Sequence, residues 1–480
     1  MTTGIRPRTI VTADPELDDL NSMIRFLLYA NEVNVEGLIY ASSRFHWRGD
    51  GKGTPFFLPD REYDSPQTSW RWKPGERFIH EAVDAYAQVH ENLGVHDERY
   101  PDPAVLRGLI REGNVEFEGD VSHETPGSQL ITEALLDDDP GPVHVQLWAG
   151  PATLARALMS IEERYADTPE WEEVHARVSA KTIVTKFASQ DGTYDDYIRP
   201  HWPDIRVTDI ATAAWGYMLR FTLPASWAPL IAPEWLRENV TSLGPLGALY
   251  RVWGDGRQMV PGDVTDFFHL AGFTADELRA QGYHVWMDPQ PAGSWISEGD
   301  TMTYLNLIVP GLRGFEHPSF GGWGGRAELT GDGPDEWAVA KVDDGEGPDS
   351  SLTRWFADAQ ADFAARLRWS VTPSFADAAH APSLSIHPGV DVAAHPGATV
   401  RLTAEASSPD GAEVTLRWWI YEQAGTCAGA RLEVADSGLE ATVQVPTDAT
   451  PGQTVHVIVE ARNATPDALV AYRRVILTVS

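Results

Sequence analysis

Short apolar strands alternate with amphipathic helices through the first three quarters of the chain. Residues 9–13 and 35–40 are β-rich runs, and the segment between them places Leu20, Met23, Ile24, Leu27 and Leu28 on one helical face. A further apolar run at 143–148 leads through a turn into a helix carrying Leu154, Leu158 and Ile161. Strand, turn and helix thus recur as a unit. This pattern predicts an α/β domain with a mostly parallel sheet flanked by helices.

The pattern changes near residue 370. An Ala- and Pro-rich stretch runs to Pro382, and beyond it apolar and polar residues largely alternate in five short segments: 399–404, 414–418, 441–445, 454–459 and 474–479. Turn signals separate these segments, which is typical of a small antiparallel β-sandwich of immunoglobulin-like type. The sequence therefore predicts a catalytic domain over 1–370 and a sandwich domain over 371–480.

Charge and cysteine content narrow the classes of partner. The 480 residues carry 37 Lys and Arg against 70 Asp and Glu, a net charge of −33, which disfavours nucleic acid polymers and anionic membranes. A single cysteine, Cys427, excludes an intrachain disulfide. Neither a signal-like apolar segment nor an 18-residue apolar run is present, so we expect a cytoplasmic protein, or a secreted one if a signal has been removed.

An acidic turn follows the first predicted strand. Asp14, Glu16, Asp18 and Asp19 place four carboxylates within six residues, where α/β sheets carry their chemistry. A hard cation would hold such oxygens together, and oxygen ligands favour Ca²⁺ or Mg²⁺. The alternative is that Asp18 caps the following helix and Asp19 favours its positive end. A second acidic turn at 297–300 brings Asp300, which would complete an oxygen cage if it folds beside the first.

These motifs resemble those of the nucleoside hydrolases. Residues 12–19 are similar to their Asp-rich N-terminal signature, 148–154 to their central strand-to-helix turn, and 298–301 to their late aspartate turn. The closer resemblance is to a bacterial family of nucleoside hydrolase-like proteins with a C-terminal sandwich domain, often labelled cellulose-binding. Segments 7–47, 242–250, 297–307 and 323–326 all fit that family, so the resemblance implies this fold over nearly the whole chain.

The resemblance also implies roles for individual residues. Asp14 matches the carboxylate that binds Ca²⁺ and deprotonates the attacking water, and Asp18 matches the residue that holds the furanose hydroxyls. The implied metal ligands are Asp14, Asp19, Asp300 and the main-chain carbonyl of Ala149. A divalent ion lowers the pKa of its bound water and orients it, which suits hydrolysis of a glycosidic bond.

Three departures from the family pattern affect the choice of substrate. Thr12 replaces the first aspartate, and Glu16 replaces a glycine. Gly299 stands where nucleoside-cleaving members often have the histidine that assists the departing base, which argues against a true nucleosidase. The ribose-binding asparagine falls near Ser43 or Arg44, and Arg44 can still hydrogen-bond a sugar hydroxyl.

Other loops at the carboxyl ends of strands supply further candidates. An O-glycoside needs a proton for its leaving oxygen, which His123, Glu124, His46 or Glu298 could provide, and His46 and Glu298 are also candidate substrate-binding residues; the alternative for each is an ordinary surface or core residue. Gln190 and Asp191 are candidate sugar ligands, or else a plain polar turn. We expect Trp47 and Trp323 to stack on sugar rings, Trp323 because its Gly-rich surroundings are a poor core element.

The sequence thus predicts a Ca²⁺-dependent glycoside hydrolase that uses metal-bound water on a furanoside or an oligosaccharide. Two alternatives stay open: a ribonucleoside N-glycosidase, and a non-catalytic carbohydrate-binding or cellulose-binding protein. The expected partner is a glycoside of low molecular weight or an oligosaccharide, and a homo-oligomer is compatible with the sequence.

Overall fold

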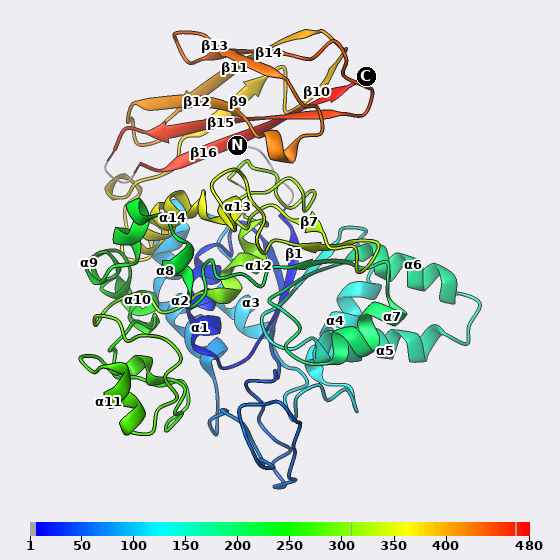
Figure 1. Ribbon diagram of the computed structural model, residues 1–480, viewed down its shortest axis with the longest axis vertical. Helices are drawn as coiled ribbons and strands as arrows, with labels where there is room; N and C mark the ends of the chain where they lie inside the picture. The colour runs from blue at the N-terminus through cyan, green and yellow to red at the C-terminus, as the bar shows by residue number, and fades with distance from the viewer. Residues whose placement is uncertain (1–5, 309, 466–467) are drawn as a thin grey trace.

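The computed structural model describes residues 6–308, 310–465 and 468–480, and Figure 1 shows a larger α/β unit with a β-sandwich at one end. Residues 1–5 of the predicted first domain lie outside the described residues. The last helix of the larger unit ends at Trp369, and the first strand of the sandwich begins at Ser383.

The larger unit is built on one eight-stranded sheet with the strand order β3-β2-β1-β4-β5-β6-β8-β7. Neighbouring strands are parallel except for the edge pair β7 and β8, so the predicted fold class is confirmed. The central strand β1 pairs Ala13 with Tyr40 of β2 and Thr12 with Leu147 of β4, which aligns three carboxyl ends. The strands are β1 Arg8–Ala13, β2 Asn34–Tyr40, β3 Ile110–Glu112, β4 Val143–Leu147, β5 Thr182–Lys186, β6 Arg206–Asp209, β7 Glu328–Leu329 and β8 Glu336–Ala338.

Helices cover both faces of this sheet. Alternate β1 residues pack into separate cores: Val11 lies in the core with α1, α2 and α14, and Ile10 in the core with α4 and α5. Every residue of α1 is buried, because α2, α10 and α14 all pack on it. The helices are α1 Leu17–Leu28, α2 Phe78–His96, α3 Pro103–Gly108, α4 Pro126–Leu136, α5 Ala152–Tyr165, α6 Trp171–Lys181, α7 Arg199–His201, α8 Leu219–Thr222, α9 Pro233–Leu236, α10 Gly244–Leu249, α11 Ala275–Ala280, α12 Met302–Leu305, α13 Ser350–Thr353 and α14 Phe356–Trp369.

Short 3-10 and π turns fill the connections. They are η1 Tyr194–Ile198, η2 Ala225–Ile231, η3 Arg237–Thr241, η4 Phe267–His269, η5 Gly299–Thr301, η6 Phe375–Asp377 and η7 Glu422–Ala424. Within the described ranges, no helix combines the length and the apolar character needed to cross a bilayer.

The C-terminal unit consists of two four-stranded sheets, ordered β10-β16-β15-β12 and β13-β14-β11-β9. One pair departs from the predicted antiparallel pattern, because β10 runs parallel to β16. The indole of Trp418 points into the sandwich core and donates to the Gly438 carbonyl at 2.7 Å. The strands are β9 Ser383–His387, β10 Asp391–Ala394, β11 Thr399–Ser407, β12 Val414–Ile420, β13 Arg431–Val434, β14 Glu440–Gln444, β15 Thr454–Asn463 and β16 Val470–Val479.

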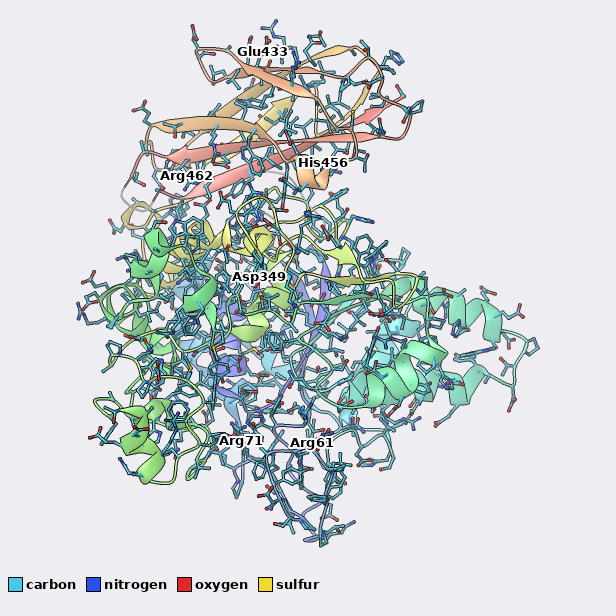
Figure 2. All side chains as sticks on the ribbon, in the orientation of Figure 1. Arg61, Arg71, Asp349, Glu433, His456 and Arg462 are labelled. Atoms are coloured by element: carbon cyan, nitrogen blue, oxygen red, sulfur yellow. The ribbon has the colours of Figure 1, made fainter. Side chains whose placement is uncertain are left out.

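The apolar core of the larger unit continues into the face of the sandwich that packs on it, while the sandwich keeps a second core of its own. Trp355, just before α14, meets the ring of Tyr472 of β16 edge-on at 5.6 Å and the tilted ring of Trp419 of β12 at 6.0 Å between ring centroids. The fully buried Arg474 donates to the carbonyls of Leu312, at 2.6 Å, and Gly321, at 2.8 Å. Figure 2 shows Arg462 on the side of the sandwich that faces the larger unit, where it pairs with Asp358 at 2.7 Å. Trp419 therefore serves domain packing.

We expect the protein to unfold in a single calorimetric transition, because this core continues from one unit into the other. Trp355→Ala should lower the free energy of unfolding by about 3–5 kcal/mol, since it removes a buried aromatic from the junction. The exposed Leu439→Ala is the matched control and should change it by less than about 0.5 kcal/mol. Two separate transitions in the wild type would contradict the shared core.

Candidate functional site

Four aspartates converge at the carboxyl end of β1. The strand ends at Ala13 and is followed by Asp14, while the first turn of α1 carries Asp18 and Asp19, and the turn η5 brings in Asp300. The exposed fractions of these residues are 1 %, 8 %, 1 % and 3 % respectively. The Asp14 amide donates to Oδ1 of Asp19 at 2.9 Å, which joins the strand end to the helix.

Glu16 and His46 complete the cluster. Ligand atoms of Asp14, Glu16 and His46 lie within 4.8 Å of one another, as do those of Glu16, Asp18 and Asp19. His46 Nδ1 is 3.2 Å from Asp14 Oδ1, without the angle of a hydrogen bond. Asp300 lies outside both triads, yet it is the strongest charged neighbour of Asp19. Glu16, which replaces a glycine of the family pattern, thus belongs to both groups.

Burial and like charge raise the pKa values of Glu16, Asp19 and Asp300. Burial is the largest cause in each case, followed by repulsion from the neighbouring carboxylates. The pKa of Asp19 and that of Asp300 both lie well above the ordinary value. Burial raises the pKa of Glu16 to about 8 and that of Asp18 to about 6. A cation among these groups would relieve the repulsion.

The side chains present fit a hard divalent cation. Both carboxylate oxygens of Asp14 are buried and make no hydrogen bond, and carboxylate oxygens are ligands that Ca²⁺ prefers. Helix capping does not account for the arrangement: the N-cap of α1 is Glu16, which makes no side-chain cap bond, and Asp19 is bonded to Asp14. Ala149 lies one residue beyond Trp148 at the end of β4, and its amide reaches the Thr12 carbonyl of β1 at 3.3 Å.

The position of Asp18 explains the glycine at 299. Ser297 Oγ donates to Asp18 Oδ2 at 3.0 Å. A Cβ atom at Gly299 would lie 2.7 Å from that same oxygen, closer than such contacts occur. The carboxylate of Asp18 thus fills the space from which a side chain at 299 would extend.

Glu298, predicted to bind substrate or donate a proton, is committed elsewhere. Its carboxylate is fully buried. It accepts hydrogen bonds from Arg25 Nε at 2.5 Å, from Arg25 Nη2 at 2.9 Å and from Tyr250 Oη at 2.5 Å. We therefore correct the expectation: Glu298 anchors the turn that carries Asp300 to helix α1.

Gln190 and Asp191 have different surroundings despite being adjacent. Gln190 donates to the Trp148 carbonyl at 2.5 Å and keeps a buried Oε1 without a partner, so it retains an acceptor beside the end of β4. Asp191 is satisfied by the amides of Ala152, at 3.1 Å, and Thr193, at 2.8 Å. Asp191 therefore secures the start of α5, which corrects its expected role as a sugar ligand.

The two tryptophans expected to stack on sugars are core residues. Trp47 is fully buried and packs against Phe56 and Tyr63, and Trp323 is 3 % exposed and packs against Tyr29. This corrects both predictions, because neither indole presents a face to a ligand.

The remaining candidate residues, Arg44, His123 and Glu124, lie outside the carboxylate cluster. The guanidinium of Arg44 reaches the Asp60 carbonyl at 3.0 Å, and the Arg44 amide donates to the Gln190 carbonyl at 2.7 Å. His123 and Glu124 are exposed, and the nearby Ser160 hydroxyl lowers the pKa of Glu124. Ser160 lies about 12 Å along α5 from its first residue. This placement argues against Glu124 and His123 as the acid, and of the predicted acids only His46 lies beside the carboxylates.

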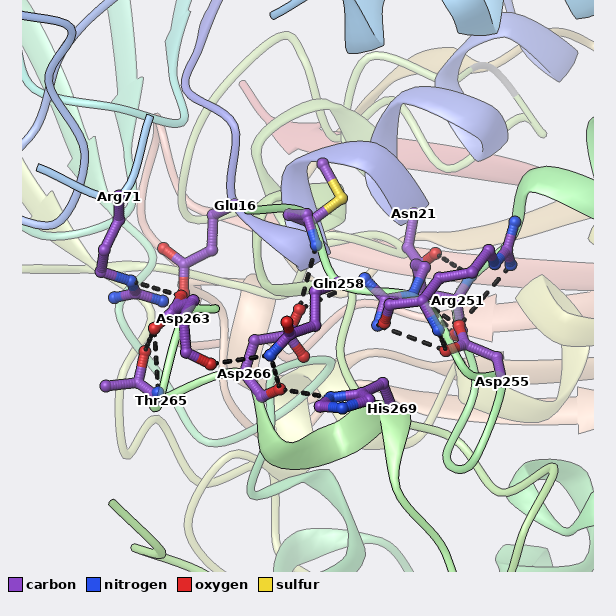
Figure 3. Close-up of polar contacts among 12 residues, drawn as sticks. Glu16, Asn21, Arg71, Arg251, Asp255, Gln258, Asp263, Thr265, Asp266 and His269 are labelled. Atoms are coloured by element: carbon purple, nitrogen blue, oxygen red, sulfur yellow. Dashed lines mark hydrogen bonds and ion pairs between the residues drawn. The ribbon is translucent and has the colours of Figure 1, made fainter. Parts of the chain in front are cut away.

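Segments without regular pattern supply neighbours that the sequence did not reveal. Tyr217 Oη donates to Glu16 Oε1 at 3.1 Å. Arg71, in the loop after β2, pairs with Asp263 at 2.7 Å, and Figure 3 shows this pair beside Glu16. The same figure shows Asn21 of α1 hydrogen-bonded to the backbone of Arg251. These bonds fix the segment 251–269 to the helix that carries Asp18 and Asp19. Of this arrangement, the sequence indicated only the part around Glu16, through the acidic run that contains it.

The fold and the site define a nucleoside hydrolase-like domain joined to a C-terminal sandwich. Residues 8–327 match the family model described as "Cellulose-binding Sde182, nucleoside hydrolase-like domain", and residues 399–479 match "Cellulose-binding protein Sde0182, C-terminal domain". The chain belongs to this cellulose-binding Sde182 family, which confirms the resemblance found in the sequence.

A solved structure has the same fold. It is a nucleoside hydrolase-related hypothetical protein from Saccharophagus degradans, described as associated with carbohydrate metabolism. The TM-score is 0.73 at 23 % identity, over 99 % of this chain and 100 % of that one. The comparison with curated proteins gives no match.

Proposed function

We propose that the chain is a Ca²⁺-dependent hydrolase of carbohydrate glycosides that acts at the carboxylate cluster after β1. This proposal rests on one observation: both carboxylate oxygens of Asp14 are buried without hydrogen-bond partners and are surrounded by further carboxylates. The family description, cellulose-binding, and the neighbour's association with carbohydrate metabolism support a carbohydrate rather than a nucleoside. Gly299, in place of the histidine that often assists a departing base, supports the same choice.

Asp14, Asp19, Asp300 and the Ala149 carbonyl would hold the ion, with Glu16 beside them. When bound, the ion would supply an oriented, polarised water molecule of lowered pKa. Asp14 takes the proton of the attacking water as the bond to the anomeric carbon forms.

The remaining steps concern the sugar and the leaving group. Asp18, fixed by Ser297, offers its remaining oxygen to the sugar hydroxyls. The bond to the leaving oxygen breaks on the face opposite the attacking water, and that oxygen takes a proton from solvent while Asp14 returns its own proton to solvent; His46, 3.2 Å from Asp14, lies on the side of the base.

Non-catalytic carbohydrate binding is the second candidate. One observation favours it: Asp14, Asp19 and Asp300 are each at most 3 % exposed, so substrate has little direct access to them. A ribonucleoside N-glycosidase is the third candidate, and the substrate screen described next distinguishes all three.

The test is calcium titration calorimetry on chelator-treated wild type, followed by hydrolysis assays with nitrophenyl furanosides, nitrophenyl pyranosides, oligosaccharides and inosine. The proposal expects one-site Ca²⁺ binding and Ca²⁺-dependent turnover of a glycoside. Turnover of inosine alone would favour the nucleosidase. Oligosaccharide binding without turnover of any substrate would favour the binding protein and overturn the hydrolase.

Gly299→Ala should lower kcat/KM by about 100-fold, because the new methyl group displaces the Asp18 carboxylate from its position. Steady-state kinetics at saturating Ca²⁺ measure the effect, and Asp18→Asn should give a loss of similar size. Gly94→Ala, where a Cβ meets no neighbouring atom, is the matched control. Unchanged kinetics in Gly299→Ala would contradict the role given to Asp18.

A further inference from the structure

An aromatic cluster extends from the carboxylates to the surface. Tyr217, whose hydroxyl donates to Glu16, stacks on Phe268 at 5.3 Å between ring centroids. Trp286 meets the Tyr217 ring edge-on at 5.0 Å and that of Phe268 at 5.6 Å. The indole of Trp286 therefore lies one aromatic ring beyond the Glu16 carboxylate.

Trp286 is unusual for its exposure. It is 40 % exposed, and among the described residues it is the tryptophan that stands with the exposed large apolar side chains. Three rings hold it in place, those of Tyr217, Phe268 and Phe267, the last at 6.2 Å. An exposed indole fixed by its neighbours is a preorganised apolar surface, which binds a flat ligand face at little entropic cost.

The segment that carries Trp286 is joined through its backbone to the segment that follows an ion pair near Glu16. The backbone of His284 donates to the Val264 carbonyl at 3.0 Å, which joins the Trp286 segment to the segment carrying Asp263. Asp263 forms an ion pair with Arg71, which lies on the loop after β2 (Figure 3). An exposed aromatic face suits a sugar ring, which offers C–H groups on its face and hydroxyls around its edge.

We propose that Trp286 stacks a sugar unit on the leaving-group side of the site, so that the site takes oligosaccharides of three or more units. This inference rests on the proposed function for the orientation of the ligand. Asp18 holds the first sugar and Glu16 with Tyr217 borders the unit bonded to it, so Trp286 meets the unit after that. A nucleoside, which has only a sugar and a base, is too short to reach the indole.

The test measures affinity against chain length. Non-hydrolysable thio-linked β-1,4-gluco- and xylo-oligosaccharides of two, three and four units are titrated into Ca²⁺-saturated wild type, Trp286→Ala and Trp286→Tyr by calorimetry. In the wild type the third unit should raise affinity about tenfold, Trp286→Ala should remove that gain, and Trp286→Tyr should keep most of it. Phe221→Ala, at an exposed aromatic outside the cluster, should leave the series unchanged.

The outcomes separate this inference from the proposed function. Affinity that does not depend on length, an equal loss for every length in Trp286→Ala, or no binding by any member of either series overturns the inference. If Ca²⁺-dependent turnover of short glycosides persists at the same time, the proposed function stands alone. Length-dependent binding through Trp286 without turnover of any substrate overturns the hydrolase and keeps Trp286 as part of a carbohydrate-binding site.

Discussion

Asp19→Asn is expected to weaken Ca²⁺ binding by at least about 100-fold and to abolish turnover. Even partners outside the coordination shell typically account for 10–100-fold in metal affinity, and Asp19 belongs to the cluster itself. The same variant should be more thermally stable than wild type in chelator, because it removes one of several buried, mutually repelling carboxylates. In saturating Ca²⁺ the order should reverse, since only the wild type gains stability from the ion.

Calorimetric titration and thermal unfolding with and without chelator measure both effects. Asp120→Asn is the matched control, because it removes a charge from a separate, half-buried group made of Glu116, Asp120 and the exposed His123. That variant should bind Ca²⁺ and turn over substrate as wild type does. Equal Ca²⁺ affinity in wild type and Asp19→Asn would refute the assignment of the cluster as the metal site.

Arg25→Met is expected to lower the free energy of unfolding by about 3–5 kcal/mol, the usual effect of leaving one partner of a buried ion pair uncompensated. Arg25 and Glu298 are both fully buried, with a shortest contact of 2.5 Å. The guanidinium also lies over the Phe363 ring at 3.7 Å, so the variant loses a cation–π contact as well.

Denaturant unfolding measures this loss, and a double-mutant cycle with Glu298→Gln isolates the pair. The double variant should be less destabilised than the sum of the single variants, because neither charge is then left alone. Arg107→Met, at an exposed pair with Asp84, should cost less than about 1 kcal/mol. Additive single effects would mean that Glu298 does not depend on Arg25.

The sequence predicted the larger unit well because its signals are local. The apolar face of residues 20–28 and the runs at 9–13, 35–40 and 143–148 each reflect the period of one element, and the structure has α1, β1, β2 and β4 there. The parallel pairing of β10 with β16 could not be read in this way, because alternation along a strand does not specify its neighbour.

The candidate site was predictable where it follows a strand and unpredictable where it depends on tertiary contacts. Asp14, Asp18 and Asp19 are adjacent in sequence, and Asp300 stood out through its acidic turn. Trp47 and Trp323 looked like ligand platforms because a Gly-rich neighbourhood says nothing of what packs on it. The environment of Trp286 depends on rings brought together from 217, 267 and 268, which no local pattern links.

The position of the sandwich has a mechanical consequence. The loop after β2 projects from the end of the larger unit opposite the sandwich, so the carboxyl ends of the strands point away from it (Figure 1). Trp355, Tyr472 and Arg474 fix the two units to each other, so the sandwich is held in one orientation rather than joined by a flexible linker. A surface bound to the outer sheet, β13-β14-β11-β9, would therefore hold the carboxylate cluster at a constant distance from that surface and facing away from it.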